Sequence, residues 1–176
     1  MSLHNVKAGV LTASDRASRG VYNDESGKLL RERLSAMEGV EVRRYDVVPD
    51  KRKAIAACLR RWCDGDALDV ILTTGGTGLS PRDVTPEATR GLLDKEIPGL
   101  AEALRLEGSG FTPLAWLSRG IAGLRGKTLI VNLPGSPQAV EQSLRVLARL
   151  LPHALAMVRG EAHAESGKAR RHAFRG

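Results

Sequence analysis

The chain has 176 residues and a mass of 18.9 kDa, which suits one compact domain better than two. Apolar residues make up 42% of the chain and charged residues 27%, so it can build a core and does not belong to the disordered class. It holds only two residues each of Trp, Tyr and Phe, which argues against nucleic-acid modules that stack bases on aromatic side chains.

The sequence shows no sign of membrane insertion or secretion. No apolar run approaches the roughly 20 residues that a membrane-spanning helix needs. The segment Met1–Lys7 lacks the apolar centre and the cleavage site of a signal peptide. We therefore expect a cytoplasmic protein without a membrane partner.

The formal net charge is +7, and basic residues are concentrated at the C-terminal end. Residues 159–176 show no apolar period, so we expect a single domain over 1–158 followed by a mobile basic tail. A positive charge of this size fits an anionic small molecule as well as it fits nucleic acid.

The two cysteines do not form a recognisable site. Cys58 and Cys63 are five residues apart in an expected helix, where their side chains would point about 140° apart, so they cannot pair within it. No CxxC spacing occurs and the histidines are scattered, so a metal site built from thiolates or imidazoles is excluded.

In chain order, the first expected element is a buried strand over 6–12, where apolar residues run continuously. A polar loop over 14–24 follows it, and leucines at helical spacing then predict a helix over 25–37. Alternating residues predict a strand over 40–48, and an amphipathic segment predicts a helix over 51–63.

A third strand, over 70–74, runs directly into a glycine-rich loop. A helix is expected over 85–93, because Thr85-Pro86 has the form of a cap followed by a first turn. The remaining expected elements are a helix over 98–107, two strands joined by a tight turn over 121–124 and 127–133, and a final helix over 136–151.

Strands that alternate with helices and carry continuous apolar runs indicate a parallel sheet covered on both faces. In such α/β sheets, ligands bind beyond the carboxyl ends of the strands. We therefore expect the site in the loops that follow the strands, which begin at Ser14, Pro49, Thr73 and Asn132.

The third of these loops is the most informative. Gly75, Gly76 and Gly78 allow positive φ angles and a close approach of backbone amides to an anion, and Thr74 and Thr77 add hydroxyl groups. A strand-to-helix turn that needs glycine only for its geometry is the alternative interpretation. The number of glycines and hydroxyls favours a binding loop.

Two aspartates follow expected strands, Asp50 after Pro49 and Asp83 before the Thr85 cap. Each could simply cap the helix after it, and Ser136 could be a plain helix cap or could help to bind an anion. Together, two carboxylates opposite an anion-binding loop favour a hard cation such as Mg²⁺, which takes few carboxylates and completes its shell with substrate phosphates.

The motif strings resemble the molybdopterin-binding proteins of molybdenum cofactor synthesis, the MogA/MoaB group, which is related to the G domain of gephyrin. The resemblance rests on TTGGTGLSPRDVT at 73–85 with PEAT at 86–89, on LPGSP at 133–137 and on SDR at 14–16. It extends in order from residue 7 to about residue 155.

The resemblance implies a three-layer α/β/α sandwich with a mostly parallel central sheet, assembled as homotrimers or higher multiples. It also implies a molybdopterin adenylyltransferase, which converts molybdopterin and ATP, with Mg²⁺, to adenylyl-molybdopterin and pyrophosphate. Asp50 and Asp83 would be the functional aspartates and metal ligands. The substrate-binding residues would be Ser14, Thr74, Gly75, Gly76, Thr77, Gly78, Ser118, Asn132, Pro134, Gly135 and Ser136.

Two alternative functions remain open at this point. Members of the MoaB branch share these motifs, so a non-catalytic protein that binds or carries molybdopterin is the first alternative; the SDRASRGVYNDESG string at 14–27 favours the MogA type. A scaffold or nucleic-acid partner that uses the basic tail is the second and weaker one. For the enzyme, a molybdenum-insertion protein is an expected partner.

Overall fold

The computed structural model describes residues 3–161, so the part of the expected tail over 162–176 lies outside the described residues. The described strands are β1 Val6–Ala13, β2 Val40–Val48, β3 Val70–Thr74, β4 Lys95–Glu96, β5 Ala122–Arg125 and β6 Thr128–Leu133. The helices are α1 Asp15–Ser18, α2 Glu25–Ser35, α3 Arg52–Asp64, α4 Thr85–Arg90, α5 Pro98–Ser109, the 3₁₀ helix η1 Pro113–Leu117 and α6 Pro137–Arg159. Within residues 3–161 no helix has the length and apolarity needed to cross a membrane.

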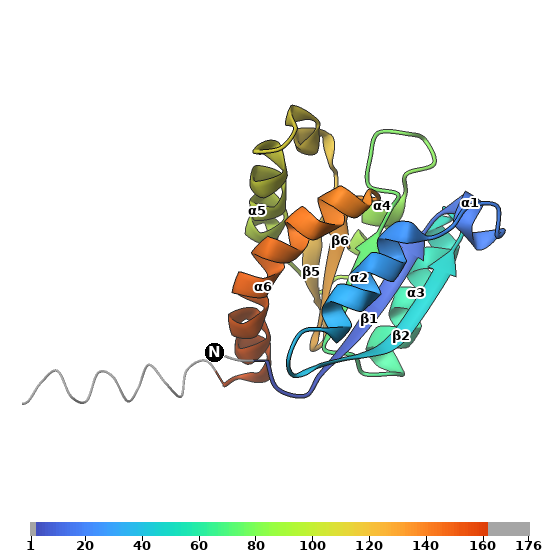
Figure 1. The fold of residues 1–176 in the computed structure, drawn as a ribbon. Helices are drawn as coiled ribbons and strands as arrows, with labels where there is room; N and C mark the ends of the chain where they lie inside the picture. The colour runs from blue at the N-terminus through green and yellow to red at the C-terminus, as the bar shows by residue number, and fades with distance from the viewer. Residues whose placement is uncertain (1–2, 162–176) are drawn as a thin grey trace, which may run out of the picture.

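The strands form one sheet in the order β2-β1-β3-β6-β5-β4 (Figure 1). The four strands β2, β1, β3 and β6 are parallel, so their carboxyl ends lie at one edge. β5 runs antiparallel to β6, and the short β4 runs antiparallel to β5. The expected α/β fold with a mostly parallel sheet is confirmed.

Helices cover both faces of this sheet, which makes three layers (Figure 1). α2, α5 and α6 pack on one face, where Leu30 and Leu147 meet Val10 of β1 and Leu72 of β3. α3 and α4 pack on the other, where Trp62 is 1% exposed. Neighbouring residues of a strand point to opposite faces, so burial of both faces explains the continuous apolar runs.

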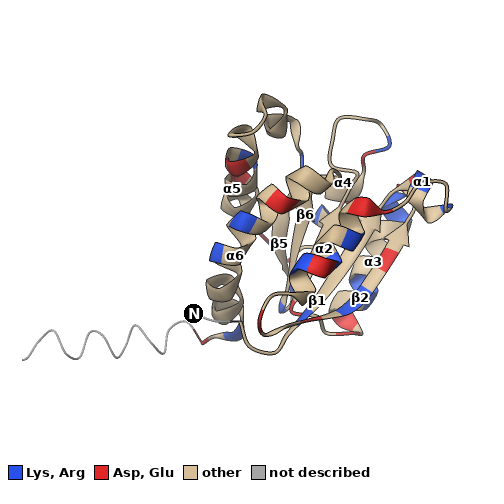
Figure 2. Ribbon diagram, in the orientation of Figure 1, with Lys and Arg blue, Asp and Glu red and all other residues tan. Residues whose placement is uncertain are grey.

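The helices that cover one face are also linked at their outer surface. Arg33 of α2 forms an ion pair with Glu141 of α6 at 2.6 Å. Figure 2 shows basic and acidic residues interspersed along these two helices. Because both partners are substantially exposed, this pair contributes little to stability compared with the apolar core beneath it.

The last helix extends further than its pattern predicts. The expected helix ends at about Leu151, but α6 continues through Pro152 to Arg159, and Leu155 stays buried in the apolar core. The guanidinium of Arg159 donates to the His4 carbonyl at 3.0 Å and to the Asp69 carboxylate at 3.1 Å. Arg159, which the expected division assigns to the tail, is therefore the last residue of α6 and is bonded to the domain.

Three short elements have no counterpart among the expected ones. α1 lies inside the expected polar loop over 14–24. In the sequence, β4 precedes the expected helix over 98–107 and η1 follows it. Each is a single turn or a pair of residues, too short for periodicity to reveal.

The two cysteines lie in α3 without a disulfide, and burial raises the pKa of both thiols to about 11.

Candidate functional site

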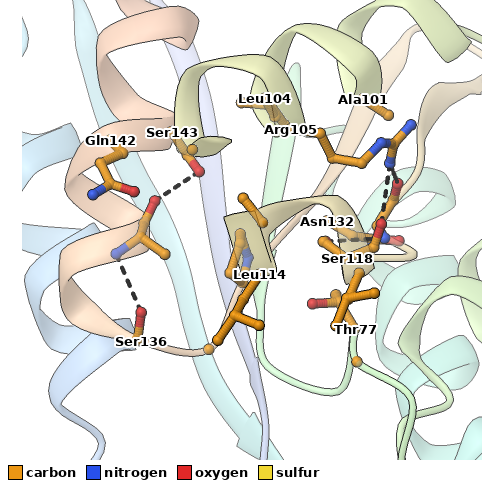
Figure 3. Close-up of a pocket in the computed structure, with 18 of the residues that line it drawn as sticks. Thr77, Ala101, Leu104, Arg105, Leu114, Ser118, Asn132, Ser136, Gln142 and Ser143 are labelled. Atoms are coloured by element: carbon orange, nitrogen blue, oxygen red, sulfur yellow. Dashed lines mark hydrogen bonds between the residues drawn. The ribbon is translucent and has the colours of Figure 1, made fainter. Parts of the chain in front are cut away.

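A cavity of about 440 Å³ opens beyond the carboxyl ends of β3 and β6 (Figure 3). The glycine-rich loop after β3 and the turn between β6 and α6 form one side of it. α5 and η1 form the other side. The site therefore lies at the edge of the sheet where the sequence predicts it.

The glycine-rich loop requires glycine at its first two positions. Gly75 and Gly76 have φ angles of +92° and +63°, in the left-handed region that other residues rarely adopt. Their carbonyls accept hydrogen bonds from Thr85, from its hydroxyl to Gly75 at 2.9 Å and from its N–H to Gly76 at 3.1 Å. The start of α4 thus holds the loop in this conformation.

The structure brings Asp50 and Asp83 to the same loop. A Cβ placed on Gly76 would lie 3.3 Å from Oδ1 of Asp50, and one on Gly78 would lie 2.9 Å from Oδ2 of Asp83. The Asp83 carboxylate also accepts a hydrogen bond from the Ser80 N–H at 2.9 Å. Asp50, which follows β2, therefore lies beside the loop after β3 that carries Asp83 itself.

A third carboxylate, that of Asp15, lies beside Asp50. The N–H of Asp15 donates to Asp50 Oδ2 at 2.8 Å, and the N–H of Asp50 donates to Asp15 Oδ1 at 3.2 Å. Burial raises the pKa of Asp50, against the lowering effect of the Asp15 N–H, and the negative charges of Asp15 and Asp83 raise it further. The carboxylates therefore repel one another when all are ionised.

This arrangement predicts that Asp50→Asn stabilises the fold at neutral pH. A carboxyl group whose pKa is raised on folding stabilises the fold below its unfolded pKa of about 4, and this contribution is lost as the pH rises through the folded pKa. At pH 7 in metal-free buffer, the variant should melt at a higher temperature than the wild type. The difference should shrink as the pH falls toward about 4.

Asp64→Asn is the matched control for this measurement. The hydrogen bond from Arg125 lowers the pKa of Asp64, so its ionised form stabilises the fold and its replacement should lower the melting temperature at pH 7. A wild type that melts above the Asp50→Asn variant at pH 7 would contradict the repulsion at the site.

Asn132 and Thr74 fix the floor of the site at the ends of β6 and β3. The side-chain amide of Asn132 donates to the hydroxyls of Thr73 and Thr89, each at 3.0 Å, and the residue is 2% exposed. Thr74 is fully buried, and its hydroxyl donates to the Pro134 carbonyl at 2.7 Å. Thr74 therefore joins the two loops rather than facing the cavity.

The α5 residues that form the wall opposite the glycine loop were not among the expected site residues. Ala101, Leu104, Arg105 and Gly108 line the cavity from α5 at the spacing of one helical face. Arg105 donates to the carbonyls of Ser118 and Gly120, which flank the connection to β5 (Figure 3). The helical spacing of the four α5 residues is a signal that the sequence contains. Nothing in the local sequence, however, shows which side of α5 faces the site.

The apolar segment over 104–117, whose use the sequence leaves open, is divided by the structure. Leu104, Leu114 and Leu117 line the cavity, although Leu114 and Leu117 are also largely exposed. Leu106, Phe111 and Trp116 are exposed and do not line it. Gln142 and Ser143 of α6, which the sequence does not single out, complete the lining (Figure 3).

A second cavity, of about 200 Å³, lies on the other side of the Gly75–Gly135 contact. Ser14 lines it, as does Asp24, which caps α2 by accepting from the Gly27 N–H at 2.9 Å. Asp24 also accepts from the hydroxyls of Thr12 at 2.7 Å and Tyr45 at 2.6 Å. Burial and the hydrogen bond to Asp24 raise the pKa of the Tyr45 hydroxyl, which thus stays a donor.

Most expected site residues therefore gather in one place. Those that line the larger cavity are Gly76, Thr77, Gly78, Asp83, Ser118, Asn132, Pro134, Gly135 and Ser136. Ser14 and Gly75 line the smaller cavity, and Gly135 lines both. Asp50 and Thr74 line neither, although Asp50 adjoins Gly76 and Thr74 is bonded to Pro134.

The carboxylates suit a cation only if other ligands complete its shell. Among residues 3–161, no group of three or more His, Cys, Asp and Glu side chains is arranged to hold a metal ion. The pair of Asp50 and Asp83 offers hard oxygen donors, which is the donor type and the low number that Mg²⁺ takes beside substrate phosphates.

Comparison with known proteins gives the same family as the motifs. Residues 9–153 match the family model described as "probable molybdopterin binding domain". The chain is 41% identical over 160 residues to a Helicobacter pylori protein named molybdopterin adenylyltransferase, covering 90% of each chain. It is 45% identical over 156 residues to the Drosophila melanogaster molybdenum cofactor synthesis protein cinnamon, covering 89% of this chain and only 26% of cinnamon.

Among solved structures, the molybdopterin biosynthesis enzyme MoaB from Thermus thermophilus superposes with a TM-score of 0.83 at 53% identity, covering 88% of this chain and 97% of that one. The family match extends over both cavities and every expected site residue. The chain is therefore a member of the molybdopterin-binding domain family.

Proposed function

We propose that this protein is a molybdopterin adenylyltransferase, which transfers the adenylyl group of ATP to molybdopterin in molybdenum cofactor biosynthesis. The observation that carries the proposal is the convergence of Asp50 and Asp83 on the Gly76–Gly78 backbone. A protein that only binds a pterin does not need a second carboxylate beside the first. The name of the Helicobacter pylori relative, which is similar over 90% of its length, supports the same activity.

In the proposed reaction, a terminal phosphate oxygen of molybdopterin attacks the α-phosphorus of ATP. A new P–O bond forms, the bond between the α-phosphorus and the bridging oxygen breaks, and pyrophosphate leaves with that oxygen. A phosphate oxygen is already anionic at neutral pH, so no side chain has to remove a proton. The chain has to position the two substrates and offset their negative charge.

The larger cavity is proposed to hold molybdopterin. Its mixed lining, with leucines from α5 and η1 and polar groups from Ser118 and Asn132, suits a flat heterocycle that also carries hydrogen-bonding edges. The Gly76–Gly78 segment borders the same cavity, so its backbone amides are available to a phosphate group.

Asp50 and Asp83 are proposed to hold Mg²⁺. When bound, the ion supplies positive charge to phosphate oxygens of the substrates. The raised pKa of Asp50 fits this role, because a cation would relieve the repulsion between the neighbouring carboxylates. Asp15 holds the Asp50 side chain in place through its N–H.

The proposal is tested by mixing the protein with ATP, Mg²⁺ and molybdopterin and measuring pyrophosphate release. We expect release that depends on all three components, with adenylyl-molybdopterin as the second product. Omitting molybdopterin from the mixture is the control for plain ATP hydrolysis. A protein that binds molybdopterin but releases no pyrophosphate would instead be the non-catalytic carrier.

We further propose that the protein works in the cytoplasm as a homotrimer or a higher multiple and passes its product to a molybdenum-insertion protein. The exposed apolar side chains of Leu106, Phe111 and Trp116, each at least half exposed, support an assembly that would cover them. Sedimentation analysis of the full chain would measure the size of the assembly.

A further inference from the structure

Arg119 contacts the glycine-rich loop at three positions and the helix after it, α4, at one. Its N–H donates to the Thr77 carbonyl at 2.8 Å, and its Nε donates to the Gly78 carbonyl at 2.6 Å. Its Nη2 donates to the carbonyl of Asp83 at 2.5 Å, and its Nη1 pairs with the carboxylate of Glu87 on α4. One residue therefore binds both ends of the segment that carries Asp83.

The position of Arg119 is itself held from α5. The guanidinium of Arg105 donates to the carbonyl of Ser118 at 3.3 Å and to that of Gly120 at 3.0 Å, the residues on either side of Arg119. Arg105 also lines the larger cavity. The contacts thus run from the α5 wall of the cavity, through Arg119, to the loop on the opposite wall.

The loop between Gly78 and Asp83 depends on outside support. Its hydrogen bonds between Ser80 and Asp83 are internal, and Leu79 is 67% exposed. The ion pair of Arg82 with Asp15 is long, at 3.8 Å, and the Arg82 side chain is largely exposed. Internal and exposed contacts of this kind do not fix a loop relative to the rest of the domain.

We propose that Arg119 is a positioning residue for the reaction, because it holds the backbone of residues 77–83 so that the Asp83 carboxylate faces the substrates. The planar guanidinium can donate to Gly78, Asp83 and Glu87 at the same time, which the single ammonium of a lysine cannot do with the same geometry. This assignment rests on the proposed adenylyl transfer and adds a residue to it.

The test compares Arg119→Ala and Arg119→Lys with the wild type in the pyrophosphate assay. We expect kcat to fall by about 100-fold in both variants, because a displacement of about 1 Å at a reacting group can cost that much. The KM for molybdopterin should change less than kcat, since most of the cavity lining remains. In hydrogen–deuterium exchange, amides of residues 76–84 should exchange faster in both variants.

Arg125→Ala is the matched control. Arg125 also binds a carboxylate and a carbonyl, those of Asp64 and Leu92, but it lies at the opposite edge of the sheet, where β5 turns into β6. Its replacement should lower the melting temperature without changing kcat or the exchange of residues 76–84. If kcat falls in Arg125→Ala as much as in Arg119→Ala, Arg119 contributes only to general stability.

Two further results would overturn the assignment. If Arg119→Lys keeps the wild-type kcat, positive charge alone suffices and the fork of hydrogen bonds is not needed. If the exchange of residues 76–84 is unchanged in both variants, Arg119 does not hold the loop. A wild type without transfer activity would contradict the proposed function instead, and the exchange experiment would still decide whether Arg119 holds the loop.

Discussion

Replacing Asp83 by Asn is expected to lower the rate of adenylyl transfer by about 100- to 1,000-fold, the loss typical of removing one preorganised electrostatic group. The asparagine side chain keeps the shape of aspartate, and its oxygen can still accept the hydrogen bond from the Ser80 N–H. Only the negative charge is lost. The affinity for molybdopterin should therefore stay nearly unchanged, as measured by titration of the pterin fluorescence.

Asp64→Asn serves again as the matched control, because Asp64 pairs with Arg125 far from the site. Its turnover should equal that of the wild type. Unchanged turnover in Asp83→Asn would eliminate the proposed metal-binding role of Asp83. A large loss of pterin affinity would instead mean that the loop has been distorted.

Replacing Gly75 by Ala is expected to disrupt the site and to destabilise the fold. The left-handed backbone alone costs about 1–3 kcal/mol for a residue with a Cβ. The new Cβ would also lie 2.4 Å from the carbonyl oxygen of Ala13, the last residue of β1, which cannot yield as a flexible side chain could. The free energy of unfolding in urea should fall by more than the backbone strain accounts for, and pyrophosphate release should fall with it.

Gly126→Ala separates the two effects. Gly126 has a φ of +54° in the turn between β5 and β6, and a Cβ there would meet nothing within 4 Å. This variant should show the cost of the left-handed backbone alone and should keep its activity. If Gly75→Ala is no more destabilising than Gly126→Ala, the close packing of the loop against β1 is not a constraint on the site.

Several expected elements were confirmed because their signals are local. The strand over 40–48 has the expected bounds in the structure, and the two strands over 121–124 and 127–133 are present as an antiparallel pair. Periodicity and turn residues act over a few neighbouring positions, so one sequence reveals them. α6 extends beyond its expected end because the packing of Leu155 in the core outweighs the helix-breaking tendency of Pro152.

The glycine loop and the two aspartates could also be proposed from the sequence, since they lie in the segments that follow expected strands. Arg119, Arg105 and the lining face of α5 could not. Each acts through contacts with segments distant in sequence, such as Arg119 with Gly78 across a separation of 41 residues. Spacing along the chain carries no information about such a contact.

The sequence by itself therefore determined five of the six described strands, most of the helices and the residue types available beyond the strand ends. Only the tertiary structure decided that β2 lies beside β1, that β6 lies beside β3 and that α5 and η1 close the cavity. The order of strands in a sheet and the side on which each helix packs depend on the burial of the whole apolar surface at once. They cannot be assigned one segment at a time.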